Sequence, residues 1–309
     1  MQKILITGGA GFIGSSLADE LLKDSKNYIV LVDNLLTGKI KNLPSKSKNV
    51  TFIKADVNNY SDISPIMTID RFDYVFHYAA IVGVERTLES PTLVLEDIDG
   101  IKNILDLSKN TGVKRVFFSS SSEVYGDPVE TPQNEKTTPL NSRLPYAIVK
   151  NLGEAFMRSY EKEFGLNYTI FRFFNTFGPK QNLDFVMSIF INKALKGEPL
   201  PVIGTGLQTR TFCYIDDNID ACIKTMKNDK YANEIINIGS DIEVSIEELA
   251  KIIIDITKSK SKIEYHPARK EGDMQHRRPD ISKMKKILKR DLTPLEKGIK
   301  KVVKEWKTN

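Results

Sequence analysis

The first half of the chain alternates short apolar runs with longer segments in which apolar residues recur at helical spacing. The short runs predict buried strands at 3–6, 28–32, 50–53, 74–76, 115–118 and 168–173. The longer segments predict helices at 12–22, 93–109 and 146–164. Strands that alternate with helices favour a parallel sheet covered on both faces. We therefore predict an α/β fold with a doubly wound parallel sheet.

The alternation becomes looser after about residue 175. Short strands are expected at 211–214 and 235–238, and helices at 216–226 and 246–256. An apolar stripe on the last helical segment predicts that it packs against the rest of the protein; its members are Leu295, Ile299, Val302 and Trp306. We expect a first domain over 1–175 and a smaller α+β lobe over 176–309, with segments near 211–238 as candidates for a return to the first domain.

Composition narrows the class of protein without identifying it. Lysine and arginine number 45 against 40 acidic residues, and the net charge of +5 suits an anionic ligand without requiring one. Two cysteines without a CxxC pattern, and three histidines without metal-ligand spacing, argue against a disulfide framework or a metal site. The sequence has no nucleic-acid motif, no apolar run of membrane length and no signal peptide. We expect a cytoplasmic protein that binds neither nucleic acid nor membranes.

A glycine-rich turn follows the first predicted strand. Gly8, Gly11 and Gly14 form a GxxGxxG pattern at a strand-to-helix junction, where the backbone can approach a pyrophosphate and the helix N-terminus attracts its charge. Asp33 ends the second predicted strand, where a carboxylate can accept the ribose hydroxyls and would repel a 2′-phosphate. The first domain is therefore predicted to be a Rossmann domain that binds NAD in preference to NADP.

A candidate proton acceptor lies in the predicted helix 146–164. Tyr146 and Lys150 are four residues apart and therefore share one face of that helix. A free phenol has a pKa of about 10, and a neighbouring ammonium favours its ionised form. The pair is expected to accept a proton from an alcohol while a hydride leaves for a nicotinamide. The strand at 115–118 runs into four serines, and a hydroxyl at this end of a parallel strand could hold the alcohol.

These motifs occur in one order along the chain and resemble those of the extended short-chain dehydrogenase/reductase family, in its NAD-dependent sugar-nucleotide epimerase/dehydratase group. The resemblance covers essentially the whole chain. Its segments are 7–14, Asp33, 77–80, 119–126, Tyr146 with Lys150, 173–179 and 204–210. The resemblance implies that the substrate is a nucleotide-diphosphate sugar, oxidised at its C4 hydroxyl.

The resemblance also implies residue roles. Tyr146 would be the base, Ser121 would orient the sugar hydroxyl, and Lys150 would bind the nicotinamide ribose and lower the pKa of Tyr146. Glu123 is a fourth candidate catalytic residue. The NAD contacts would come from Gly8, Gly11, Phe12, Ile13, Asp33, Asn34, Asp56, Val57, Tyr78, Ala79, Ala80, Tyr146 and Lys150. The substrate contacts would come from Ser122, Asn175, Arg210, Arg269 and Arg277, because guanidinium groups suit phosphate oxygens.

The chain departs from the family pattern at two places. Where the family has NxxGT before the catalytic strand, this chain has Asp97 and then Asp99, Gly100 and an isoleucine. We expect this change to alter how the catalytic strand is braced. The GW of the family near the end of the substrate lobe is replaced by residues 287–290. Neither change removes Ser121, Tyr146 or Lys150.

Three outcomes after oxidation stay open: release of the keto sugar by a 4-dehydrogenase, decarboxylation and 4-epimerisation. Glu123 and Arg277 resemble residues of UDP-glucuronate decarboxylases. Glu85 stands where it would repel an acidic substrate. Ser122 stands where 4,6-dehydratases have their acid, and this replacement argues against dehydration. The sequence does not distinguish UDP, GDP, CDP and dTDP sugars.

The resemblance leaves one non-enzyme alternative and one expectation about assembly. The alternative is a dinucleotide-sensing protein of the same fold, but such proteins typically lose the Tyr or the Lys that this chain keeps. In the family, the helices corresponding to 93–109 and 146–164 pair with those of a second copy. A homodimer with a four-helix interface is therefore expected.

Overall fold

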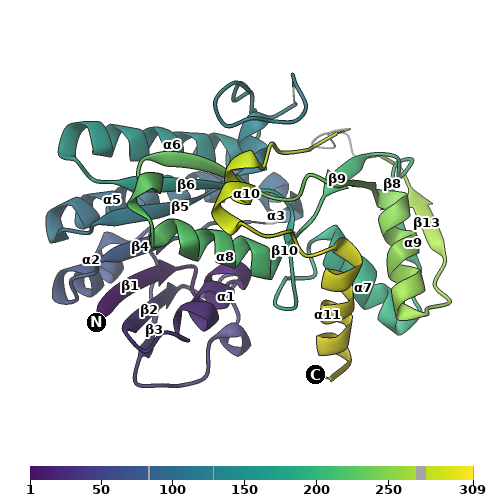
Figure 1. Cartoon of the computed structure of the whole chain (residues 1–309), viewed down its shortest axis with the longest axis horizontal. Helices are drawn as coiled ribbons and strands as arrows, with labels where there is room; N and C mark the ends of the chain where they lie inside the picture. The colour runs from purple at the N-terminus through teal and green to yellow at the C-terminus, as the bar shows by residue number, and fades with distance from the viewer. Residues whose placement is uncertain (83, 128, 269–275, 309) are drawn as a thin grey trace. The chain divides into compact units, whose positions relative to one another are not determined.

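The computed structural model of the chain describes residues 1–82, 84–127, 129–268 and 276–308 (Figure 1). The chain divides into two compact units, each assembled from separate stretches of sequence. The first unit combines 1–124, 142–172 and 222–236, and the second unit combines 125–141, 173–221 and 237–309. The chain therefore passes from the first unit to the second close to residue 175, and a segment within 211–238 returns to the first unit. Residues 125–141, expected in the first domain, belong to the second unit.

Among the described residues, the first unit is built on a seven-stranded sheet in the order β11-β6-β5-β4-β1-β2-β3. Its strands are β1 (Gln2–Thr7), β2 (Asn27–Asp33), β3 (Val50–Lys54), β4 (Tyr74–His77), β5 (Arg115–Ser121), β6 (Tyr168–Phe173) and β11 (Glu234–Ile238). β1 pairs in parallel with β2 on one side and with β4 on the other, so the strand order reverses between β1 and β4. The doubly wound sheet is confirmed. Ligands of such sheets bind at this switch point, beyond the carboxyl ends of the strands.

Helices cover the sheet of the first unit (Figure 1). They are α1 (Phe12–Leu21), α2 (Tyr60–Ile69), α3 (Val84–Glu89), α4 (Pro91–Leu95), α5 (Asp97–Thr111) and α6 (Pro145–Phe164), with short 3₁₀ turns at Ile40–Asn42, Ser122–Tyr125 and Asp229–Tyr231. Leu5 and Val30 join α2, α5 and α6 in one apolar cluster. Ile4 and Ile6 flank Leu5 in β1 and point to the opposite face of the sheet. They are also fully buried, as expected for strands covered on both sides.

The helix predicted at 93–109 is two helices. α4 begins with Pro91, at a position where the missing N–H is not needed. Glu96 caps the end of α4. Its N–H bonds to the carbonyl oxygen of Leu93, three residues back, at 3.2 Å, whereas an α-helix bonds four residues back. α5 then begins at Asp97, and the carboxylate of Asp97 accepts the N–H of Ile81 at 2.8 Å. The break thus places an acid at the N-terminus of α5, beside the segment that follows β4.

In its described part, the second unit contains three two-stranded sheets and several helices. The strand pairs are β7 (Thr176–Phe177) with β10 (Cys213–Tyr214), β8 (Leu200–Ile203) with β13 (Ile263–His266), and β9 (Thr209–Thr211) with β12 (Glu243–Ser245). The helices are α7 (Val186–Lys196), α8 (Ile215–Met226, which ends in the first unit), α9 (Ile246–Thr257), α10 (Ser282–Leu288) and α11 (Leu295–Thr308). The predicted stripe on α11 is packed: Ile299 and Val302 are buried, and the Trp306 indole donates to the carbonyl of Pro179 at 2.8 Å.

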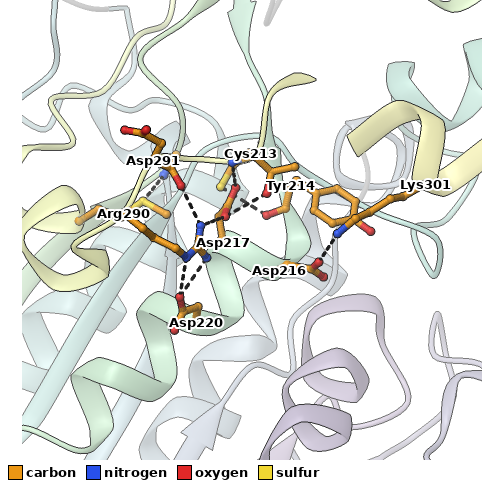
Figure 2. Close-up of polar contacts among 11 residues, drawn as sticks. Cys213, Tyr214, Asp216, Asp217, Asp220, Arg290, Asp291 and Lys301 are labelled. Carbon is orange, nitrogen blue, oxygen red and sulfur yellow. Dashed lines mark hydrogen bonds and ion pairs between the residues drawn. The ribbon is translucent and has the colours of Figure 1, made fainter. Parts of the chain in front are cut away.

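A polar cluster holds the C-terminal part of the second unit against α8 (Figure 2). Asp217 is buried, and its carboxylate accepts from the Arg290 guanidinium at 2.6 Å and from the Thr293 N–H at 2.7 Å. Arg290 also pairs with Asp220 at 2.9 Å. These bonds fix the segment that connects α10 to α11.

Nothing in the described ranges is a helix of the length and apolarity needed to cross a bilayer.

Candidate active site

The glycine turn lies between β1 and α1 and closes against the segment after β4. Gly8 has a φ of 68°, and a Cβ on it would lie 2.8 Å from the carbonyl oxygen of Tyr78. A Cβ on Gly14 would lie 2.4 Å from the carbonyl oxygen of Gly8. Only glycine fits these positions, because any side chain would push the turn away from its neighbours. The first N–H groups of α1 are consequently presented at the switch point of the sheet, as binding of a pyrophosphate requires.

Asp33 lies beside this turn at the end of β2. Its carboxylate accepts the N–H of Ala10 at 3.0 Å and that of Leu35 at 2.8 Å. Burial raises the pKa of Asp33, and the hydrogen bonds from Leu35 and Ala10 act in the opposite direction. The carboxylate is therefore held in one place against the glycine turn. This arrangement fits the ribose of NAD, and it disfavours a 2′-phosphate by charge repulsion.

The other predicted NAD contacts gather at the same edge of the sheet. The Thr7 hydroxyl, at the end of β1, accepts the N–H groups of Tyr78 and Ala79 at 3.1 and 3.2 Å. This ties the residues after β4 to the end of β1. The amide of Asn34 donates to the carboxylate of Asp56 at 3.0 Å, which links the ends of β2 and β3. The remaining predicted contacts follow from these elements: Phe12 and Ile13 open α1, Gly11 precedes it, Val57 follows β3 and Ala80 follows β4.

The proposed proton acceptor and its lysine lie at the start of α6. The helix begins with Pro145, so Tyr146 is in its first turn and Lys150 one turn later. The Lys150 ammonium is 3% exposed and donates to the Ser119 hydroxyl at 3.4 Å. It also lies 5.8 Å from the centre of the Tyr146 ring. Burial lowers the pKa of Lys150 to about 8, and the Asp97 carboxylate acts in the opposite direction.

The pKa of Tyr146 differs from the expectation based on Lys150. Burial raises the pKa of Tyr146 well above 10, the Ser121 hydroxyl lowers it, and the carboxylates of Glu123 and Asp97 raise it further. Lys150 was expected to lower the pKa of Tyr146, but the net shift is upward. The spacing of Tyr146 and Lys150 reveals the ammonium but not the burial of the phenol, and burial is the larger effect here.

The serine run places its hydroxyls at the end of β5. Ser119, Ser120, Ser121 and Ser122 are all buried. The Ser121 hydroxyl accepts the N–H of Glu123 at 3.2 Å and also interacts with the Tyr146 phenol. Because Glu123 acts on the pKa of the same phenol, Ser121, Glu123, Tyr146 and Lys150 form one cluster within the first unit.

Asp97 is a site residue whose role the sequence pattern did not reveal. Burial raises the pKa of Asp97, while the N–H of Ile81 and the Lys150 ammonium lower it. Its carboxylate thus belongs to the electrostatic surroundings of the Tyr146 and Lys150 pair. The departure of this position from the family's NxxGT was the only signal of it.

The predicted substrate residues are divided between the units. Ser122 belongs to the first unit, whereas Asn175, Arg210 and Arg277 belong to the second. The Asn175 amide donates to the carbonyl of Thr211 at 3.0 Å, and the Arg210 guanidinium donates to the carbonyl of Thr209 at 2.8 Å. Arg277 is buried, and Arg269 lies outside the described residues. No group of three or more potential metal ligands occurs in the part of the chain that the structure describes.

Residues 4–239 match the NAD dependent epimerase/dehydratase family. The chain belongs to this family. The NAD contacts, Ser121, Tyr146 and Lys150 all fall within the matched segment.

Similar proteins act on nucleotide sugars. The UDP-N-acetyl-alpha-D-glucosaminuronate decarboxylase of Bacillus cytotoxicus is 37% identical to this chain over 319 residues, which cover 99% of this chain and 97% of the relative. The UDP-glucose 4-epimerase of Thermotoga maritima, solved with UDP-glucose, has a TM-score of 0.93 and 32% identity over 99% of both chains. The UDP-glucuronic acid 4-epimerase of Bacillus cereus, solved with UDP-glucuronic acid and NAD, has a TM-score of 0.90 and 29% identity, and the match covers 99% of this chain and 100% of that one.

These comparisons confirm the predicted class. The protein is an NAD-dependent nucleotide-sugar enzyme of the extended short-chain dehydrogenase/reductase type. The roles of the individual site residues stay predictions.

Proposed function

We propose that this protein uses NAD to oxidise the C4 hydroxyl of a UDP-linked hexuronic acid and then decarboxylates the 4-keto sugar. The observation that carries the proposal is the place of Glu123 in the turn that follows β5. Its N–H donates to the Ser121 hydroxyl at 3.2 Å, and its carboxylate raises the pKa of Tyr146. The similarity to the Bacillus cytotoxicus decarboxylase along almost the whole chain supports the same reaction class.

The oxidation step assigns one task to each of three side chains. Tyr146 accepts the proton of the C4 hydroxyl, Ser121 holds that hydroxyl against it, and Lys150 keeps a positive charge nearby. NAD, when bound, accepts the hydride from C4 and later supplies it again. Burial alone disfavours the phenolate. NAD, when bound, would supply a positive charge that adds to that of Lys150 in stabilising the phenolate.

The decarboxylation step follows from the chemistry of the keto sugar. A ketone at C4 is β to the carboxylate carried by C5, so the bond between C5 and that carboxylate can break with its electron pair moving toward the C4 oxygen. Carbon dioxide leaves and an enolate remains. We assign the return of a proton to C5 to Glu123, whose charge acts on the Tyr146 phenol. Hydride then returns to C4, so that the cycle needs no external oxidant.

A 4-epimerase is the second candidate function. The fold similarity to the Thermotoga maritima UDP-glucose 4-epimerase over 99% of both chains favours it. The two candidates share C4 oxidation and differ in what happens to the keto sugar. Glu123 favours decarboxylation, because a proton donor at C5 is needed only when a bond at C5 is broken.

The proposal is tested by mass spectrometry of the purified enzyme incubated with UDP-glucuronic acid, UDP-N-acetylglucosaminuronic acid, UDP-glucose and UDP-N-acetylglucosamine. Loss of the mass of carbon dioxide from a uronic acid supports the proposal. An unchanged mass with inverted stereochemistry establishes the 4-epimerase instead. A loss of two hydrogens with accumulation of NADH identifies a 4-dehydrogenase, and GDP-, CDP- and dTDP-sugars in the same panel test the nucleotide.

The role of Tyr146 is tested by Tyr146→Phe. We expect the turnover number to fall by about 10²- to 10⁴-fold, because the proton acceptor is removed while the ring is kept. Tyr160→Phe is the matched control: Tyr160 lies on the same helix and its hydroxyl donates to Asp106 at 2.9 Å, away from the cluster around Ser121. A Tyr146→Phe variant as active as the wild type would contradict the assignment of the base.

The expected homodimer stays a proposal, supported by exposed apolar side chains on α6. Ile148 and Leu152 are four residues apart on that helix and are 45% and 37% exposed. A second copy that packed on this face would cover both. Light scattering at micromolar protein concentration tests the expectation, and a mass equal to one chain would refute it.

A further inference from the structure

Three ionisable side chains stand four residues apart along α6: Tyr146, Lys150 and Glu154. Each interacts with a different hydroxyl among the last three residues of β5. Ser121 interacts with Tyr146, Ser119 accepts from Lys150 at 3.4 Å, and Ser120 donates to Glu154 at 2.7 Å. The first two contacts belong to the candidate active site. The third lies one helical turn further on and has no part in the proposed chemistry.

Glu154 connects α6 to two neighbouring strands of the sheet. Its carboxylate is 0% exposed and receives two bonds from Arg172 on β6, Nε to Oε1 at 2.8 Å and Nη2 to Oε2 at 2.7 Å. Oε1 also accepts from Ser120 on β5. Arg172 is itself only 2% exposed. The two planar groups therefore meet edge to edge in the dry interior between helix and sheet.

This buried ion pair has a geometric role rather than a stabilising one. Replacing such a pair with apolar residues of similar volume is often neutral or stabilising, so burial of charge does not by itself account for the pair. Three directional bonds to one carboxylate do fix where that turn of helix lies on the strands. The preceding residue, Gly153, packs tightly against β5, since a Cβ there would lie 2.4 Å from the Phe118 ring. A small slide of α6 would break the bonds to Ser120 and Arg172 together.

We propose that Glu154 is a positioning residue: bonded to Ser120 and Arg172, it fixes α6 on β5 so that Tyr146 and Lys150 meet Ser121 and Ser119. This inference rests on the proposed function for its kinetic consequences. The binding of NAD gives a readout that does not depend on the identity of the sugar.

The central experiment compares Glu154→Gln with Arg158→Gln. Glutamine keeps the shape of Glu154 but not the charge or the full set of acceptors for Arg172. We expect kcat to fall about 10- to 100-fold, the size of effect seen when reacting groups are misplaced by about 1 Å, with the KM for the sugar nucleotide changed less than about twofold. We also expect severalfold weaker NAD binding by fluorescence titration. Arg158, whose side chain is 44% exposed, approaches the same carboxylate at 3.5 Å, a longer distance than those of Arg172, so Arg158→Gln should change none of these quantities.

A double variant separates positioning from stability. Glu154→Leu with Arg172→Met replaces the pair by apolar side chains, and we expect its melting temperature to recover toward that of the wild type. Its kcat and NAD affinity should stay low, because Ser120 has lost its acceptor and the helix its anchor. Recovery of kcat and NAD affinity along with the melting temperature would show that Glu154 only stabilises the fold, and would overturn the proposal.

The test also distinguishes failure of the inference from failure of the proposed function. If the wild type binds NAD but converts none of the sugars tested, the proposed function fails, while NAD affinity still reports on the positioning role. If Glu154→Gln does not fold, Ser120→Ala removes the same link with a smaller perturbation. Unchanged kcat and NAD affinity in that variant would equally overturn the proposal.

Discussion

Each unit of the protein contains a buried carboxylate paired with an arginine, but the two pairs differ in how far the cation is buried. Glu154 is 0% exposed and Arg172 2%, whereas Asp217 is 1% exposed and its partner Arg290 is 39% exposed. Both acids accept three or more hydrogen bonds. The pair in the first unit joins one helix to two strands of the sheet, and the pair in the second unit joins α8 to the segment before α11.

The difference shows that an acid–arginine pair can serve two purposes with the same chemistry. In the first unit both side chains are shielded from water, so loss of the Glu154 carboxylate removes the bidentate partner of a buried cation. In the second unit Arg290 also pairs with Asp220 and borders solvent, so it keeps stabilising surroundings when one bond is lost. The buried pair therefore demands one geometry, while the half-exposed pair tolerates several. The first pair lies one helical turn from the candidate active site, and the second closes a chain connection.

The largest effect is expected from removing the acid of the fully buried pair. Glu154→Leu should lower the free energy of unfolding by about 3–5 kcal/mol, because the buried Arg172 guanidinium loses both bonds to the Glu154 carboxylate. Thermal or urea denaturation measures the loss. The Glu154→Leu/Arg172→Met variant is the control and should regain most of it. A Glu154→Leu single variant as stable as the wild type would remove the contrast between the two pairs.

A smaller effect is expected from the half-exposed pair. In Arg290→Gln, the buried Asp217 keeps the N–H and the hydroxyl of Thr293 as donors. We expect a loss of about 1–2 kcal/mol, since hydrogen bonds to a charged group are each worth about 1.5–3 kcal/mol and part of the set remains. The kcat should be unchanged if the connection before α11 does not control the chemistry. A loss of unfolding free energy as large as that of Glu154→Leu would mean that exposure of the cation does not determine how much each pair contributes to stability.

The regions differ as well in how much the sequence could predict. The glycine turn, Asp33 and the pair of Tyr146 and Lys150 each have a local pattern, because one turn or one helix face determines their geometry. The alternation of strands and helices predicted the parallel sheet for the same reason. Nothing local pairs Glu154 with Arg172, 18 residues away on β6, or with Ser120, 34 residues away on β5.

Burial and chain connectivity were the properties that sequence patterns could not supply. The pKa of Tyr146 is set mainly by burial, which depends on the packing of α6 against the sheet rather than on the spacing of Tyr146 and Lys150. The helix breaks at Glu96, and Asp97 directly after the break accepts the N–H of Ile81, a residue 16 positions earlier. Residues 125–141 belong to the second unit through long-range pairings such as Gln133 with Pro279.

Asp97 extends the comparison to a partly buried acid that, among the described residues, has no ion-pair partner within contact distance. Its carboxylate raises the pKa of Lys150 and also that of Tyr146. In the proposed mechanism Tyr146 must lose its proton while Lys150 keeps one, so kcat rises with the first ionisation and falls with the second. Two separate limbs require that the positive charge of NAD, when bound, lowers the pKa of Tyr146 below that of Lys150. Asp56, Glu123 and the amide of Asn58 belong to the same surroundings and are unchanged in the variant below.

Asp97→Asn keeps the shape of this side chain and removes its charge. Both pKa values should fall, and both limbs of the pH profile should therefore move to lower pH, by about 1 unit or less at the effective dielectric constant of such sites. The alkaline limb reports on Lys150, whose pKa is about 8. Asp99→Asn, at an exposed position in the same first turn of α5, should leave the profile in place. A shift to higher pH would mean that Asp97 acts through its bond to Ile81 rather than through its charge. In that case contact geometry, and not charge alone, would govern the effect of Asp97.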